Sequence, residues 1–203
     1  MPRRLPGWGK ADAADLVGFT REELATYAGK TVDDLLGPDV RLLFVGINPG
    51  LWTAATNTHF CHPSNRFYPA LRAAGLIAWR IDMSVGMSAE ERMRLAAIGI
   101  GITNLVPRAT VRASELSRDE LREGAMRLER VVADVEPAVV AVAGLTAYRT
   151  AFGRPGAVLG PQPESIGVSR LWVVPNPSGL NAHETIESLA TWYRRAAEAA
   201  GLT

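Results

Sequence analysis

The sequence predicts an α/β protein with three layers, in which helices cover both faces of a central, mostly parallel sheet. Two continuous apolar runs, 41–47 and 138–143, are typical of strands buried on both faces. Amphipathic stretches that begin with capping residues alternate with these runs, as in a doubly covered sheet. The hydrophobic content of 47% over 203 residues suits one compact core with a short extension, but not two full domains.

The expected helices are marked by their first turns or by their buried faces. Capping boxes pair Thr20 with Glu23, Ser88 with Glu91 and Ser117 with Glu120. Thr31 and Asp34 predict a further turn. Two more helices are expected, one with Phe67, Leu71 and Ala74 on its buried face and one over 184–199. The expected strands are 41–47, 98–106, 138–143 and a hairpin over 165–175.

These elements divide the chain at residue 38. Residues 1–38 are expected to form an N-terminal extension that is partly helical, with a loosely ordered arm over 1–18 that is rich in Pro, Gly, Ala and Arg. Pro38 closes this extension, and residues 39–203 form the main domain.

Charge and cysteine content narrow the function classes. The net charge is only +1, which neither predicts nor excludes a local groove for nucleic acid. The single cysteine, Cys61, excludes an intrachain disulfide framework and a four-thiolate iron–sulfur cluster. The apolar runs are too short to span a membrane, and the N-terminus has no signal-peptide pattern. We therefore expect a cytoplasmic protein without membrane contact.

Two expected strands end in an asparagine and a proline, with a glycine close behind. The segments are Gly46-Ile-Asn-Pro-Gly50 and Asn176-Pro-Ser-Gly179. Ligands bind outside the carboxyl ends of strands in such sheets, so both segments are expected to line one site. Pro49 restricts Asn48 to extended geometry, and the Asn48 amide can orient a water or donate to a ligand. The alternative interpretation is an ordinary tight turn.

Two apolar side chains stand in polar loops. Phe60 can stack on a flat ring, or it can plug the core beneath its loop. Leu180 can act as a wedge that enters a nucleic-acid duplex, or it can fold back into the core. The two interpretations of each residue differ in the exposure that they require.

The histidines near Phe60 do not predict a metal site. His59, Cys61 and His62 are too close in sequence to surround one tetrahedral ion, and the chain has only one other histidine. We expect instead that His62, Asn65 and Arg66 brace their loop by hydrogen bonds. The three candidate loops also lack acidic residues, so a paired-carboxylate mechanism has no members there.

In this order and with this spacing, the segments resemble the mismatch-specific uracil-DNA glycosylase and thymine-DNA glycosylase family, within the uracil-DNA glycosylase superfamily. The resemblance runs from about Arg41 to Gly201. Segments 46–51 and 176–180 are similar to the first and second motifs of that family, and 62–67 and 101–111 are also similar to it. It implies the three-layer fold of the superfamily and makes residues 39–203 a glycosylase domain.

The resemblance also implies an activity. Such an enzyme flips uracil, or thymine or another damaged base, out of mismatched duplex DNA and hydrolyses its glycosidic bond, leaving an abasic site for base excision repair. It needs no metal or organic cofactor, and it acts as a monomer on double-stranded DNA containing a mispaired or damaged base. A cytoplasmic location beside a bacterial-type nucleoid is expected.

The family's roles can be assigned to residues of this sequence. Asn48 would position the attacking water, Phe60 would stack on the flipped base, and backbone amides near Ile47 and Phe60 would bind the carbonyl edge of that base. The implied base pocket consists of Ile47, Gly50, Thr53, Phe60 and Asn176. The implied DNA wedge consists of Gly179, Leu180 and Asn181. Ala182 stands where well-known bacterial members carry an arginine, so the resemblance does not fix the opposite-base preference.

Two other functions are compatible with the same residues. One is a hydrolase or binding protein for free nucleosides or nucleotides, which would have no use for an exposed Leu180. The other is a lesion-binding protein without turnover, since none of the three loops contains a strong base.

Overall fold

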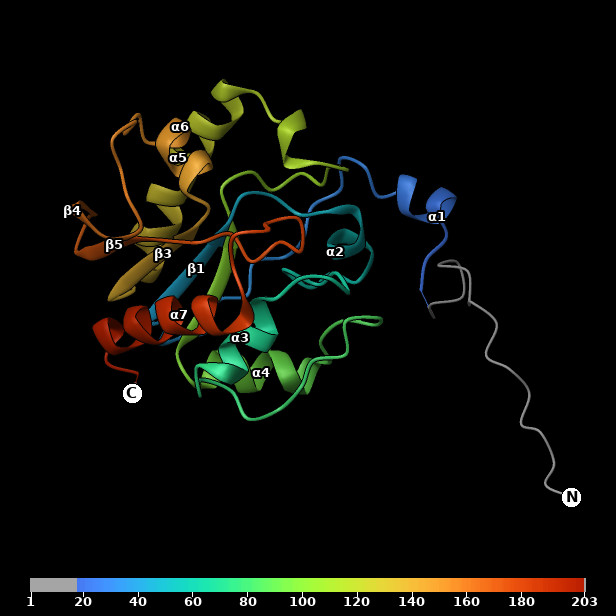
Figure 1. The fold of residues 1–203 in the computed structure, drawn as a ribbon, viewed down its shortest axis with the longest axis horizontal. Helices are drawn as coiled ribbons and strands as arrows, with labels where there is room; N and C mark the ends of the chain where they lie inside the picture. Colours follow the sequence, from blue (N-terminus) through green and yellow to red (C-terminus); the bar gives the residue numbers. More distant parts are fainter. Residues whose placement is uncertain (1–17, 203) are drawn as a thin grey trace, which may run out of the picture.

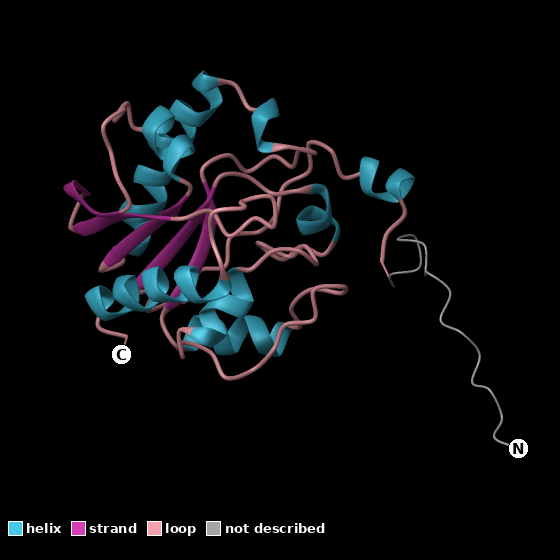
Figure 2. Ribbon diagram, viewed as in Figure 1, coloured by secondary structure: helices cyan, strands magenta, loops and turns pink. Residues whose placement is uncertain are grey.

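The computed structural model describes residues 18–202. One five-stranded sheet has the order β2-β1-β3-β5-β4, and among its pairs only β4–β5 is antiparallel. Helices α3, α4 and α7 lie on one side of it, and α5 and α6 lie on the other (Figure 1, Figure 2). The predicted three-layer α/β/α class is confirmed. The strands are β1 Leu42–Gly46, β2 Ile100–Asn104, β3 Val139–Ala143, β4 Gly160–Ile166 and β5 Ser169–Val174.

The central strands are apolar because both of their faces are covered. Every residue of β1, β2 and β3 is buried. Alternate side chains of β1 face opposite layers: Leu42 and Phe44 pack in the cluster beneath α3 and α7, whereas Leu43 and Val45 pack in the cluster beneath α5 and α6. The continuous run in the sequence therefore builds two cores.

The predicted helix starts are confirmed. Thr20, Ser88 and Ser117 each accept a hydrogen bond from the backbone N–H three residues on, and the glutamate at that position bonds back to the cap. The helices are α1 Arg21–Ala25, α2 Leu51–Ala55, α3 Phe67–Ala73, α4 Ala89–Ala97, α5 Arg118–Val135, α6 Leu145–Ala151 and α7 Ile186–Ala200, with a 3₁₀ turn over Ala113–Glu115. None of the helices within residues 18–202 is long and apolar enough to cross a bilayer.

Three elements differ from the expectation. Helices α2 and α6 were not predicted, because both are short and neither has a side-chain cap at its first residue. Strand β4 begins at Gly160 rather than near 165, since Pro161 and Pro163 hide the strand pattern. Proline is tolerated here because β4 is an edge strand.

The end of the N-terminal extension is extended rather than helical. Thr31 forms a bridge with Arg108, and Leu35 forms one with Ile102, so the turn expected at Thr31 and Asp34 is wrong. Pairing with the sheet edge satisfies the same backbone groups that a turn would satisfy. The division of the chain at residue 38 stays a prediction, and the arm predicted over 1–18 lies, apart from Gly18, outside the described residues.

A partly buried ion pair fixes this extension to the domain. The Asp34 carboxylate accepts hydrogen bonds from Arg127 on α5 (2.7 Å) and from the Thr103 hydroxyl on β2 (2.6 Å). Val32 and Leu35, on either side of it, are buried. The extension therefore packs on β2 as part of the domain core.

Candidate functional site

The carboxyl ends of the parallel strands meet where the chain changes direction across the sheet. From β1 the chain crosses first to β2 on one side and later to β3 on the other, so β1 and β3 flank the topological switch point. Ile47 and Asn176 follow β1 and β5, and both approach Gly144 at the end of β3. A Cβ at Gly144 would lie 3.2 Å from Ile47 Cδ1 and 3.9 Å from Asn176 Nδ2. The two segments thus lie together at this edge of the sheet, as the sequence predicts.

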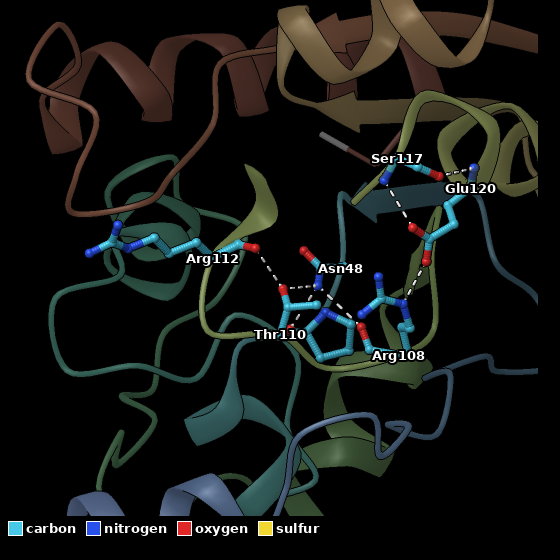
Figure 3. Close-up of polar contacts among 7 residues, drawn as sticks. Asn48, Arg108, Thr110, Arg112, Ser117 and Glu120 are labelled. Atoms are coloured by element: carbon cyan, nitrogen blue, oxygen red, sulfur yellow. Dashed lines mark hydrogen bonds and ion pairs between the residues drawn. The ribbon is translucent and has the colours of Figure 1, made fainter. Parts of the chain in front are cut away.

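Asn48 is fixed at the tip of β1 by its own amide nitrogen. Nδ2 lies 2.7 Å from the Thr110 hydroxyl oxygen and 3.1 Å from each of the carbonyl oxygens of Arg108 and Pro49. These acceptors occupy both N–H groups, so Asn48 has no donor left for a ligand. The side-chain oxygen points away from Thr110 and Arg108, as Figure 3 shows. Asn48 therefore presents an acceptor, suited to hold a water.

The segment after β2 is tied to Asn48 at several points. The Thr110 backbone N–H donates to the Pro49 carbonyl (3.1 Å), and the Thr110 hydroxyl donates to the Arg112 carbonyl (2.9 Å). Arg108 is anchored by an ion pair with Glu120, whose carboxylate also accepts a hydrogen bond from the Ser117 backbone N–H (Figure 3). Because the Thr110 hydroxyl proton is used on Arg112, its oxygen is left to accept from Asn48. This relay sets the orientation of the Asn48 amide.

A second asparagine, Asn104, ends β2 beside Gly46. A Cβ at Gly46 would lie 2.2 Å from Asn104 Oδ1 and 3.1 Å from Phe60 Cζ, so only glycine allows these two groups to meet there. Asn104 is 6% exposed. Among the described residues its Oδ1 has no hydrogen-bond donor, yet it is not one of the fully buried unpaired atoms. Asn104 therefore offers a carbonyl oxygen at the site.

His59 sets the orientation of Asn104. His59 Nε2 lies 2.9 Å from the Asp33 carbonyl oxygen, which can only accept, so Nε2 carries the ring proton. Nδ1 is then an acceptor, and it lies 3.0 Å from the Asn104 amide nitrogen. Desolvation by burial lowers the pKa of His59 to about 4, so the ring is neutral at pH 7. The N-terminal extension thereby reaches the site through Asp33.

The sequence left open whether Phe60 plugs the core or has a ring that is free to stack, and its surroundings have features of both. One ring face stacks on Phe67 at 4.2 Å between centroids, and Phe67 is fully buried in the core. Phe60 itself is only half-buried, and its backbone has a φ of 55°, which aromatic residues seldom adopt. The ring is backed by the core while the residue as a whole stays partly exposed.

The backbone N–H groups at Ile47 and Phe60 were also predicted to bind a ligand. Among residues 18–202, the N–H groups of Ile47 and Phe60 donate to no protein acceptor. Such unpaired N–H groups suit the carbonyl edge of a base. Two other predicted pocket residues lie close by in the chain. Gly50 is exposed, and Thr53 is buried in α2 with its hydroxyl 3.5 Å from the Cys61 carbonyl oxygen.

The loop after β5 presents Leu180 to solvent. Leu180 is 91% exposed, so the interpretation as a core leucine is wrong. Asn176 Oδ1 accepts from the Ser178 N–H (2.9 Å), which leaves its amide nitrogen on the side of Gly144. Asn181 donates to the Asn176 carbonyl (3.0 Å) and braces the loop from inside. Gly179 is also exposed.

The histidines and the cysteine near Phe60 have hydrogen-bonding roles. His62 pairs with the Ser64 hydroxyl (2.9 Å), the Cys61 thiol donates to the Met83 carbonyl (3.4 Å), and Asn65 accepts from the Phe67 N–H (2.9 Å). Burial raises the pKa of the Cys61 thiol and lowers the pKa of His62. The prediction that His62 and Asn65 brace their own loop by hydrogen bonds is confirmed. Arg66 instead donates to the loop after β5.

The family model described as "Uracil DNA glycosylase superfamily" matches residues 34–199. The chain belongs to the uracil DNA glycosylase superfamily. Membership implies a hydrolase that acts on DNA and cleaves the N-glycosidic bond of uracil. The fold is also similar to a solution NMR structure described as a "putative Uracil DNA glycosylase" from Methanosarcina acetivorans. That match has a TM-score of 0.56 and 17% identity, and it covers 86% of this chain and 98% of the other.

Four residues of the candidate site were not assigned to it from the sequence. Contacts between distant segments determine the positions of all four, which are Asn104, His59, Thr110 and the Arg66 side chain. Only Asn104 had a usable signal, because it is a polar residue at the end of a predicted strand, like Asn48 and Asn176.

Proposed function

We propose that this protein is a mismatch-directed member of the superfamily that flips uracil out of duplex DNA and hydrolyses its glycosidic bond. The observation that carries the proposal is Asn48: both of its N–H groups are held, and its oxygen is directed away from them at the switch point. That oxygen can accept a hydrogen bond from one water and hold it in line for attack. Thymine and other damaged bases are proposed as further substrates of the same pocket.

The reaction needs positioning rather than a strong base. The bond between C1′ of the sugar and N1 of uracil breaks, and its electron pair leaves with the base. The water oxygen bonds to C1′, and a proton leaves that oxygen for solvent or for the departing base. Since an amide cannot take this proton near neutral pH, we expect a slow enzyme that relies on charge stabilisation of the leaving base.

The same edge of the sheet offers groups that fit uracil. The free N–H groups of Ile47 and Phe60 suit the carbonyl oxygens of the base, and Asn104 Oδ1 suits the N3–H. Phe60 provides a ring for stacking, with Phe67 behind it. Asn176 supplies an amide nitrogen on the β5 side.

The wedge supports DNA over a free nucleoside as the substrate. An apolar side chain that is 91% exposed in a polar loop serves no purpose for a small molecule, but it can fill the gap left by an extruded base. Extrusion requires less free energy where pairing is weak, so we expect U·G to be processed faster than U·A.

The test is to incubate the protein with duplex oligonucleotides that contain one uracil opposite guanine or adenine, and then to cleave with alkali. Strand breaks at the uracil position support excision. Retarded mobility of the duplex without breaks would support the lesion-binding alternative. Release of base from free deoxyuridine, but not from DNA, would support the small-molecule alternative. Equal rates on U·G and U·A would contradict the mismatch preference, but not the excision of uracil.

A further inference from the structure

Arg66 sits at the start of α3, but its guanidinium reaches into the loop after β5. NH1 donates to the Glu184 carbonyl, and NH2 donates to the carbonyls of Ser178 and Asn181 (2.7 Å to the latter). These three acceptors span the wedge loop, residues 177–184, on both sides of Leu180. The Arg66 backbone N–H also donates to the Pro177 carbonyl (3.0 Å). Arg66 therefore contacts the loop at four of its carbonyl groups.

The wedge loop and the segment 62–66 are also in close steric contact. A Cβ at Gly179 would lie 2.6 Å from both the carbonyl oxygen and the hydroxyl oxygen of Ser64, so only glycine fits at this contact. Gly179 immediately precedes Leu180, and Ser64 lies two residues before Arg66. The loop is thus pressed against the segment 62–66 at the residue next to the wedge.

The same segment supports the base-stacking ring. Phe67 follows Arg66 in the chain, and its ring lies behind Phe60. The Phe67 N–H is capped by Asn65. The segment 62–67 therefore connects the ring proposed to hold the flipped base with the loop proposed to fill its place.

Resting on the proposed function, we propose that Arg66 is a positioning residue for the wedge, and that it holds Leu180 at a fixed place relative to Phe60. Without the guanidinium, the three carbonyls lose their shared donor and the exposed loop is free to shift. Extrusion then becomes harder, because the side chain that must enter the stack is no longer presented in advance.

The experiment compares Arg66→Lys and Arg66→Met with wild type in single-turnover excision. The substrates are uracil in a U·A duplex, in a U·G duplex and in single-stranded DNA. Lysine retains the charge but reaches only one acceptor at a time, whereas methionine retains the length without charge. Arg72→Met, on the exposed side of α3, is the matched control.

We expect both Arg66 variants to slow excision from the U·A duplex by about 10-fold to 100-fold, the scale of a misplaced group. The loss should be smaller on U·G and smallest on single strands, while Arg72→Met matches wild type. In a Leu180→Ala background, Arg66→Lys should change the ratio of duplex to single-strand rates little, because the positioned side chain is gone.

Three other results would overturn this inference without touching the proposed function. Equal losses on all three substrates with a lower melting temperature would mean that Arg66 only stabilises the fold. A second such result is that Arg66→Lys keeps the wild-type rates while Arg66→Met reduces the salt dependence of DNA binding by about one ion. Arg66 would then contact phosphate directly. The third is that the rate losses of Arg66→Lys and Leu180→Ala add fully in the double variant, which would mean that Arg66 does not act through the wedge. A wild-type protein that leaves uracil in every substrate would overturn the proposed function and this inference together.

Discussion

Asn48 illustrates how one side chain can be given a single chemical role by its neighbours. An amide has two donors and an acceptor, and it could present either to a ligand. Here the carbonyls of Arg108 and Pro49 and the hydroxyl of Thr110 occupy the donors. The oxygen alone is left, which suits a water and not a base carbonyl.

Replacing Asn48 with alanine should lower single-turnover excision of uracil by about 100-fold or more, because one preorganised polar group at the reacting centre is lost. Binding of the uracil duplex, measured by fluorescence anisotropy, should change little, since the phosphate contacts and the wedge are kept. Thr110→Ser, which retains the hydroxyl acceptor, serves as the control and should remain near wild type. Near-normal cleavage by Asn48→Ala would remove Asn48 from the mechanism.

At the scale of elements, loops from distant parts of the chain form the site, and each is held by the rigid layer beneath it. The wedge loop lies against the segment 62–66, and Thr110 pairs with the turn that follows β1, at Pro49 and Gly50. The extended end of the N-terminal extension bonds to His59 through Asp33. Loops so fixed lose little conformational freedom when DNA binds, which favours productive binding.

Truncating the wedge by Leu180→Ala should weaken excision most for U·A, less for U·G and least for single-stranded DNA, in the order of the free energy needed to open the pair. The melting temperature should stay within error of wild type, because a side chain that is 91% exposed contributes little to the core. Single-turnover rates on the three substrates and a thermal melt measure both effects. A clear drop in melting temperature together with uniform rate losses would contradict the wedge.

At the scale of the whole molecule, the buried His59 makes stability depend on pH. Its pKa is about 4 in the folded protein and about 6.5 in an unfolded chain. Between these values the unfolded state binds more protons than the folded state. Stability is therefore constant above pH 6.5 with respect to this group, and it falls as the pH drops from 6.5 to 4. The charged groups around the ring are Asp34, Arg92 and Arg127.

The free energy of unfolding should accordingly decrease by up to about 1.4 kcal/mol per pH unit in this window. Urea titrations between pH 7.5 and pH 4.5 measure the slope. His59→Gln should be less stable at pH 7 but should show a flatter dependence on pH. His62→Asn is the matched control. The pKa of His62 is shifted in the same direction as that of His59, but His62 is exposed. Parallel curves for wild type and His59→Gln would show that another group carries the dependence.

The sequence by itself determined the elements whose signals are local. The apolar runs of β1 and β3, the capping boxes at Thr20, Ser88 and Ser117, and the asparagines at the ends of β1 and β5 are all properties of a few adjacent residues. The rule that parallel strands present their carboxyl ends at one edge then brought Asn48 and Asn176 together. The exposure of Leu180 and that of Phe60 could only be stated as alternatives.

Only the tertiary structure decided which atoms of these residues are free. Asn48 is oriented by Thr110, which lies 62 residues away, and the wedge loop is held by Arg66, which lies 115 residues from Asn181. Asn104 is oriented by a histidine whose tautomer depends on a carbonyl in the N-terminal extension. A hydrogen bond depends on tenths of an ångström and on the direction of a lone pair. Those quantities arise only when the layers pack, so spacing along the chain does not specify them.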